Sequence, residues 1–223
     1  MELVKQLEFL DPSVISESIH IIGCGAIGST VAVMLTRMGF TDIHLYDFDT
    51  VEDKNVCNQT FFTCHIDKNK TEAIATTMWA INSDCKITKH TEGWKPETNL
   101  DGYVFLCVDS IELRKQIVEE NQYNPLVKAF IDFRMGLTGA QSYAAICDNE
   151  KDMKCLIASM QFTDAEAKAA MPVSACGSSL SVRFTVVGIV CAGIANFVHI
   201  LKKTGRQKRV IILDYTDFST VTM

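Results

Sequence analysis

The chain has 223 residues, a formal net charge of −6 and 48% hydrophobic residues. This length and apolar content allow one large domain or two small ones, with a core that needs no disulfide or metal to fold. The acidic charge repels phosphate backbones, so we expect no nucleic-acid binding.

Strands and helices alternate along the first part of the chain, as the periodicity of its apolar residues indicates. We expect a helical lead-in at 2–17 that is interrupted near Pro12. We expect strands at 20–23, 42–47, 86–90, 103–108, 127–133, 140–147 and 209–214, and helices at 27–39, 67–81, 110–121 and 182–203. The polar segment 148–174 is predicted to be a flap. The pattern predicts one α/β domain over residues 1–223, a Rossmann-like sheet with helices on both faces. The sheet should be parallel in its N-terminal half, with antiparallel strands toward the C-terminus.

One apolar segment is long enough to be weighed as a membrane span. Residues 184–201 contain no Asp, Glu, Lys or Arg, and eighteen such residues reach the lower limit for a spanning helix. Asn196 and His199 lie within the segment, and both are costly in lipid. We therefore predict a buried helix at the core or at a dimer seam, and no membrane association.

The nine cysteines form no Cys-x-x-Cys pair and lie mostly inside apolar runs. This arrangement is typical of buried thiols in a reducing compartment rather than of a disulfide framework or a zinc ribbon. The first ten residues contain no apolar run of the kind that marks a signal peptide. We therefore expect a cytoplasmic protein.

A glycine turn joins the first predicted strand to the first long helix. It reads Gly-Cys-Gly-Ala-Ile-Gly at 23–28, the GxGxxG pattern in the strand-to-helix context of nucleotide-binding sites. The first glycine permits the tight turn, the second lets phosphates approach the backbone, and the third lets the helix pack closely. Free N–H groups at the helix start then face the anion. The candidate binding residues here are Gly23, Gly25, Ala26, Ile27 and Gly28.

Two further observations limit the ligand of this turn. Ser29 stands where a P-loop has its phosphate-binding lysine, so the P-loop alternative fails. Asp47 ends the second predicted strand, where a carboxylate can accept hydrogen bonds from ribose hydroxyls. These features suit NAD and ATP equally well.

A polar segment after the second strand separates these two ligands. A dehydrogenase usually continues into another helix, but here amide side chains follow at Asn55, Asn58 and Gln59. Such amides can donate hydrogen bonds to phosphate and accept them from ribose or adenine. The segment favours ATP over NAD.

This stretch resembles the ThiF/MoeB/HesA family, the bacterial relatives of ubiquitin-activating enzymes. The family signature is Asp-x-Asp-x-Val-x-x-x-Asn-Leu-x-Arg-Gln after the second strand. The positions that match in register are Asp47, Asp49, Val51, Asn55 and Gln59. Lys70 opens the next helix, near the place of the family's phosphate-binding lysine. Asp109 follows the strand at 103–108, as the family's magnesium-binding aspartate does, and Arg114 lies on the next helix.

The resemblance implies a fold, an activity and partners. It implies an adenylyltransferase that binds ATP over the glycine turn, with its ribose on Asp47, its Mg²⁺ on Asp109 and its phosphates near Lys70. The activated carboxylate would be the C-terminus of a small ubiquitin-like or sulfur-carrier protein. Since a carboxylate is already ionised, catalysis needs positioning and charge stabilisation but no general base. The resemblance also implies a homodimer.

One residue departs from the family pattern. Asn58 stands where the family has an arginine that contacts ATP phosphates, and no arginine precedes Arg37 to replace the family's N-terminal one. A lost charge-assisted hydrogen bond costs about 1.5–3 kcal/mol. Lys5 and Lys54 are candidates to compensate. Two alternatives therefore stay open: a catalytically degenerate nucleotide-binding scaffold, and an NAD-dependent oxidoreductase.

Cys176 is the candidate nucleophile for a later thioester step. It lies just before the long apolar helix, and a helix N-terminus lowers the pKa of a thiol. Small members of the family often have a cysteine at this place. The alternative is an inert packing thiol. Cys57, Cys64 and His65 match no familiar set of metal ligands.

Overall fold

The computed structural model of the protein describes residues 1–170, 172–173 and 180–223. Its strands are β1 (Ile19–Ile22), β2 (Asp42–Tyr46), β3 (Lys86–His90), β4 (Gly102–Leu106), β5 (Val127–Met135), β6 (Gly139–Ile146), β7 (Val210–Asp214) and β8 (Ser219–Thr222). Its α-helices are α1 (Ala26–Arg37), α2 (Lys70–Ile81), α3 (Ile111–Asn121), α4 (Glu150–Ala158), α5 (Asp164–Ala170) and α6 (Arg183–Leu201). Cys176 lies outside the described residues.

The strands form one mixed sheet in the order β3-β2-β1-β4-β5-β6-β7-β8. The first five strands in this order are parallel, and β6, β7 and β8 are added in antiparallel fashion. The four residues of β1 are all buried, as expected for a central parallel strand covered on both faces. The predicted fold class is confirmed.

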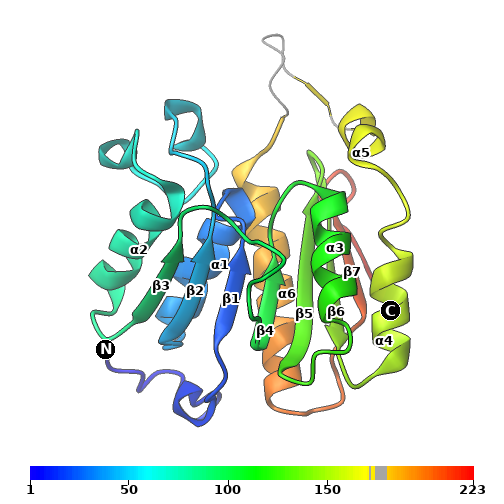
Figure 1. Cartoon of the computed structure of the whole chain (residues 1–223), viewed down its shortest axis with the longest axis horizontal. Helices are drawn as coiled ribbons and strands as arrows, with labels where there is room; N and C mark the ends of the chain where they lie inside the picture. Colours follow the sequence, from blue (N-terminus) through cyan, green and yellow to red (C-terminus); the bar gives the residue numbers. More distant parts are fainter. Residues whose placement is uncertain (171, 174–179) are drawn as a thin grey trace.

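Helices cover both faces of the sheet (Figure 1). Helices α1, α2 and α6 share one apolar core with β1, β2, β4 and β5, whereas α3 and α4 enclose a second core on the opposite face. Along β1, Ile21 enters the first core and Ile22 the second, because successive strand residues point to opposite faces. The sheet therefore separates two apolar cores.

Three segments differ from the sequence-based expectation. The lead-in contains only turns and a 3-10 helix at Pro12–Val14, because Pro12 begins a short helix that Asp11 caps. The expected flap at 148–174 begins with helix α4, whose first N–H groups bond the side chain of Asn149, and continues with α5. Strand β8 was not predicted, since all four of its residues are exposed and show no apolar alternation.

Helix α6 is long and apolar enough to cross a membrane by length and composition alone. In the structure it packs against β5, β6, β7 and α1. Phe197 is completely buried against Phe40, Tyr103 and Phe105. Asn196 is satisfied by hydrogen bonds with the backbone of Lys208. The helix contributes to the core, as predicted.

Histidine and tyrosine side chains stack across three neighbouring strands on the α3 face of the sheet. The rings of Tyr46 and His90 are parallel with centroids 4.0 Å apart, and those of His20 and His44 are 4.5 Å apart. His20 Nε2 lies 2.7 Å from the carboxylate of Asp101. Burial lowers the pKa of His20 although Asp101 opposes this effect, and burial followed by the charge of His44 lowers the pKa of His90.

These shifts predict that stability falls in mild acid. The unfolded chain, whose histidines have a pKa of about 6.5, takes up protons before the folded chain does. The free energy of unfolding is therefore at its full value above about pH 6.5 and decreases as the pH falls toward the lowered pKa values. His90→Phe keeps the stacking on Tyr46 but removes one proton site, so we expect a smaller loss between pH 7 and pH 5.

Urea denaturation at several pH values measures this effect. The matched control is Thr88→Val, an uncharged change on the same strand, which should keep the pH dependence of the unchanged protein. An equally steep loss of stability in His90→Phe would contradict the assignment of the pH dependence to this histidine.

Candidate functional site

The candidate site lies at the carboxyl edge of the parallel strands, the upper edge in Figure 1. From β1 the chain proceeds to β2 on one side, whereas β4 is the neighbour on the other side. This reversal of strand order is a topological switch point, the place where open α/β sheets bind ligands. The glycine turn, Asp47 and Asp109 follow β1, β2 and β4, respectively.

The three glycines of the turn have different surroundings. Gly23 has a φ of +93°, and an added Cβ would lie 2.8 Å from the backbone of Cys107. A Cβ on Gly28 would lie 1.8 Å from the carbonyl oxygen of Gly23. Gly25 has no atom within 4 Å of its Cβ position. The outer glycines are needed for packing, whereas the middle one leaves the backbone open to a ligand.

The N-terminus of α1 is suited to an anion. Gly25 is its N-cap, no side chain caps the helix, and its first turn has no acidic residue. The N–H groups of Ala26 and Ile27 belong to the first turn, which has no carbonyl partners within the helix. Unpaired N–H groups and the helix dipole both favour negative charge at this point.

Asp47 is fixed against the glycine turn. Its carboxylate accepts hydrogen bonds from the N–H of Cys24 at 2.7 Å and from the N–H of Asp49 at 2.9 Å. Burial raises the pKa of Asp47, and the hydrogen bonds and Lys70 oppose this shift. A carboxylate in this position combines two roles, because it shapes the turn and can still accept hydrogen bonds from a ligand.

Lys70 is a buried cation at the same edge. Its Nζ lies 2.7 Å from a carboxylate oxygen of Asp49, and the residue is 8% exposed. The preceding Asn69 donates from Nδ2 to the backbone oxygen of Asp47 at 3.2 Å. Buried lysines are rare unless paired, so the start of α2 is built to keep this ammonium group beside the end of β2.

The segment that carries Asn55, Asn58 and Gln59, the amide segment, is attached to the first turns of α1. The N–H of Thr60 donates to Ser29 Oγ at 3.0 Å. Asn55 is buried, and its side-chain oxygen accepts from the N–H of Glu52 at 2.9 Å. Gln59 has a buried side-chain oxygen with no hydrogen-bond partner among the described residues. Asn55 thus shapes the segment, whereas Gln59 has an unused acceptor.

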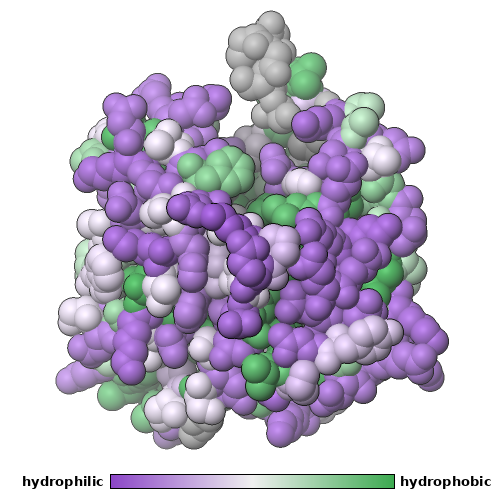
Figure 2. Space-filling model, viewed as in Figure 1, coloured by the Kyte–Doolittle hydropathy of each residue, from purple (hydrophilic) through white to green (hydrophobic). Residues whose placement is uncertain are grey.

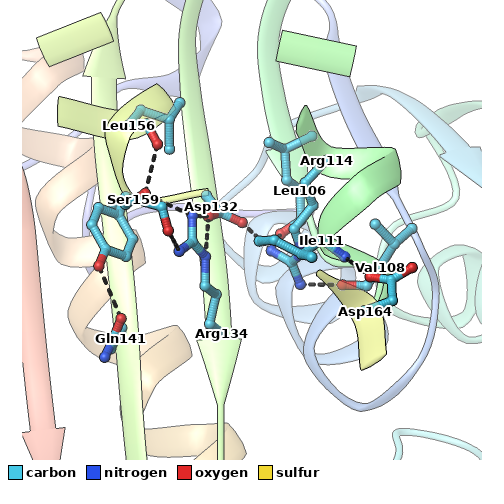
Figure 3. Close-up of polar contacts among 11 residues, drawn as sticks. Leu106, Val108, Ile111, Arg114, Asp132, Arg134, Gln141, Leu156, Ser159 and Asp164 are labelled. Carbon is cyan, nitrogen blue, oxygen red and sulfur yellow. Dashed lines mark hydrogen bonds and ion pairs between the residues drawn. The ribbon is translucent and has the colours of Figure 1, made fainter. Parts of the chain in front are cut away.

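Asp109 is exposed just beyond β4, and a buried ion-pair network supports the backbone before it (Figure 3). Arg114 donates to the backbone oxygens of Leu106, at 3.1 Å, and of Val108, and it pairs with Asp132. Asp132 is completely buried and also accepts from Nε of Arg134 at 2.7 Å. Arg114 thus positions the chain that leads to Asp109.

Sequence reasoning missed three polar residues near this edge. Asp132 is the buried centre of the arginine network. Asp164, on α5, accepts from the hydroxyl of Ser110 at 2.7 Å and from the N–H of Ile111 at 2.6 Å, and so caps α3. Arg183, on α6, reaches the amide segment. No local motif marks these residues because, apart from the pairing of Asp132 with Arg134, each contact spans at least eighteen positions. An acidic residue inside the buried strand at 127–133 was the only available signal.

Two of the described cysteines near this edge are poor nucleophiles. Cys24 and Cys107 are buried, and desolvation raises the pKa of both thiols. At the opposite edge of the sheet, beside the start of β5, desolvation raises the pKa of Cys147 to about 12. No cluster of three or more His, Cys, Asp or Glu side chains that could bind a metal occurs among the described residues. The role predicted for Cys176 stays a prediction.

The family model for the ThiF family matches residues 13–222. The chain belongs to the ThiF family. The predicted resemblance is therefore confirmed, and the match extends from before β1 into β8.

Curated relatives match a shorter part of the chain. Ubiquitin-like modifier-activating enzyme 5 of Drosophila willistoni is 33% identical over 136 residues, which cover 52% of this chain and 32% of that protein. The enzyme of the same name from Drosophila virilis is 32% identical over 145 residues, covering 56% of this chain and 35% of that protein. The chain thus matches about a third of the length of these relatives.

Solved structures share the fold over nearly the whole chain. PaaA has a TM-score of 0.71 and 16% identity, covering 93% of this chain and 64% of its own. A structure of Escherichia coli MccB with ATP has a TM-score of 0.70 and 16% identity, covering 93% of this chain and 63% of its own. The likeness places the whole sheet and its helices within one known architecture.

The open surroundings of Gly25 generate a prediction about binding. Gly25→Ala should leave the thermal unfolding temperature unchanged, because the new methyl group meets no atom within 4 Å. The methyl group would lie where phosphates approach the backbone, so ATP·Mg²⁺ should bind about tenfold more weakly by isothermal titration. Gly139→Ala, whose nearest neighbour is at 3.8 Å, is the matched control. Unchanged affinity in Gly25→Ala would refute a phosphate site at this turn.

The ion-pair network generates a prediction about stability. Asp132→Asn leaves two partly or fully buried arginines without a counter-charge, so it should lower the free energy of unfolding by about 3 kcal/mol. Chemical denaturation measures the loss. Glu150→Gln, which removes an exposed ion pair with Lys154, should leave stability unchanged. Equal effects of the two substitutions would show that the network does not support the fold.

Proposed function

We propose that this chain binds ATP at the glycine turn and adenylates a carboxylate. The observation that carries the proposal is the open backbone at Gly25, located between the carboxylate of Asp47 and the end of β4. A buried ammonium group at Lys70 and an exposed carboxylate at Asp109 lie at the same edge of the sheet. Membership of the ThiF family and the fold shared with MccB, one structure of which contains ATP, support the same conclusion.

The reaction is a nucleotidyl transfer. A carboxylate oxygen attacks the α-phosphorus of ATP, the bond from that phosphorus to the bridging oxygen of the β-phosphate breaks, and pyrophosphate leaves with the electron pair. The N–H groups of Ala26 and Ile27 would bind phosphate oxygens at the helix N-terminus. Lys70 would add positive charge, and Gln59 would use its unpaired side-chain oxygen on the nucleotide. The adenylate product is an activated acyl group.

Asp109 is the residue we assign to Mg²⁺. Its carboxylate is exposed at the site edge, and Mg²⁺ commonly uses one or two carboxylates together with substrate phosphates and water. The absence of a larger cluster of ligands among the described residues fits this mode. When bound, the ion would neutralise charge on the phosphates. Arg114 acts indirectly, because it fixes the backbone before Asp109.

The carboxylate substrate we propose is the C-terminal tail of a small ubiquitin-like or sulfur-carrier protein. The relatives named ubiquitin-like modifier-activating enzyme 5 support this class. Large apolar side chains are exposed beside the site, on Phe48 next to Asp47 and on Phe162 before α5. Figure 2 shows a mostly hydrophilic face with small apolar patches near its upper edge. Transfer of the acyl group to Cys176, or to a thiol of another protein, would follow adenylation.

A homodimer is part of the same proposal. Phe184, Val187, Cys191 and Ala195 are exposed on α6. Their spacing of three or four residues places them on one side of the helix. This apolar stripe would pack against its copy in a second chain.

Pyrophosphate exchange tests the proposed activity. With ATP·Mg²⁺, labelled pyrophosphate and a panel of peptides ending in Gly-Gly, we expect label to enter ATP in the presence of a cognate tail. Asp109→Asn should slow the exchange about a hundredfold because charge stabilisation is lost. Asp217→Asn, in the exposed turn between β7 and β8, is the matched control and should leave the rate unchanged.

Other outcomes identify the alternatives. Binding of ATP without exchange for any tail would indicate a nucleotide-binding scaffold, the alternative that Asn58 raises. Tight binding of NADH would indicate an oxidoreductase. Exchange that is unaffected by Asp109→Asn would refute the role assigned to this carboxylate.

A further inference from the structure

Among the described residues, Arg183 is a cation without a counter-ion. Its Nη1 donates to Thr30 Oγ1 at 2.8 Å and to the backbone oxygen of Asn58 at 3.1 Å, and its Nη2 donates to Thr60 Oγ1 at 3.1 Å. All three acceptors are neutral. No ion pair of Arg183 occurs among the described residues, and residues 174–179 contain no Asp or Glu that could supply one.

The guanidinium group is partly buried, and burial lowers its pKa. A desolvated charge is costly unless it is paired. The three recorded hydrogen bonds use both N–H groups of Nη1 and one of Nη2, so the fork retains the N–H of Nε and one of Nη2. With respect to the described residues, Arg183 therefore has both unpaired charge and unused donors, the two properties that an anion would satisfy.

The location connects Arg183 to the glycine turn. Thr30, which accepts from Arg183, donates through the same hydroxyl to the carbonyl oxygen of Ala26 at 2.7 Å. Two hydrogen bonds therefore separate the guanidinium group from the backbone of the turn. The same Nη1 of Arg183 also donates to the backbone oxygen of Asn58.

The N-termini of α1 and α6 add to the positive potential around Arg183. Helices α1 and α6 pack against each other and both begin at the upper edge in Figure 1. Neither has a side-chain cap or an acidic residue in its first turn. The positive ends of two helix dipoles thus lie with one unpaired guanidinium group at the same edge. Lys54, which the sequence also offered as a replacement for the missing arginine charge, lies 2.9 Å from the carboxylate of Glu52.

We propose that Arg183 binds the β- and γ-phosphates of ATP and supplies the positive charge that Asn58 does not. The inference rests on the proposed function and deepens it, because it assigns the stabilisation of the pyrophosphate leaving group to a side chain from α6. The contact adds to that of Lys70, which approaches from α2. A bidentate guanidinium contact is well matched to phosphate oxygens.

The test separates contacts to the outer phosphates from contacts to the rest of the nucleotide. Isothermal titration of Arg183→Met with ATP·Mg²⁺ and with AMP should show about tenfold weaker binding of ATP, the loss expected for a charge-assisted contact. AMP affinity should change by less than about twofold, since AMP lacks the outer phosphates. Arg206→Met, which removes an exposed arginine on a distant loop, is the matched control and should bind both ligands normally.

A second variant distinguishes charge supply from packing. Asn58→Arg in the Arg183→Met background returns a guanidinium group to the neighbouring residue, and it should restore most of the affinity for ATP. Arg183→Lys keeps a charge without the fork. It should bind ATP with intermediate affinity and serves as the folded comparison if Arg183→Met unfolds.

The results also separate this inference from the proposed function. A parallel loss of ATP and AMP affinity, or no loss of either, would overturn the inference, as would failure of Asn58→Arg to restore ATP binding. If the unchanged protein exchanges pyrophosphate while Arg183→Met behaves identically, only the inference fails. If the unchanged protein does not bind ATP·Mg²⁺, the proposed function fails as well.

Discussion

The close approach of the glycine turn to the end of β4 is the constraint on which the site depends. A side chain at Gly23 or at Gly28 would collide with backbone atoms of Cys107 or of Gly23 itself. The first strand can therefore turn directly into α1 and bring the positive end of this helix to the switch point. Asp47 fixes the same turn from β2. The proposed binding surface is thus made of backbone, and the surrounding side chains place positive and negative charges around it.

The charges at this edge come from elements that are far apart in the sequence. The ion pair with Asp49 keeps Lys70 beside β2. Arg114 supports the chain before Asp109, and the buried Asp132 neutralises the charge of Arg114. Arg183 approaches from α6, on the opposite face of the sheet from α3. An arrangement of this kind assembles only when the whole sheet is formed, so the site and the fold are energetically coupled.

Much of the fold was available from the sequence, because β1, α1, β2 and α2 each have a strong local signal. The glycine turn and Asp47 were predicted from the sequence pattern, whereas Asp49 was predicted from the resemblance to the family signature. The capping of α3 by Asp164 and the contact of Arg183 with Asn58 were not, since they join residues 54 and 125 positions apart. Strand β8 was missed because an exposed edge strand needs no apolar pattern. The sequence thus indicated the backbone part of the candidate site and most of its charged residues, but not Asp132, Asp164 and Arg183.

A crystal structure with a non-hydrolysable ATP analogue and Mn²⁺ tests the central claim most directly, because Mn²⁺ can be located by its anomalous signal. We expect the α-phosphate at the N–H groups after Gly25, the ribose hydroxyls on Asp47 and the metal on Asp109. A nucleotide bound elsewhere, or a metal far from Asp109 while the phosphates avoid the glycine turn, would contradict it.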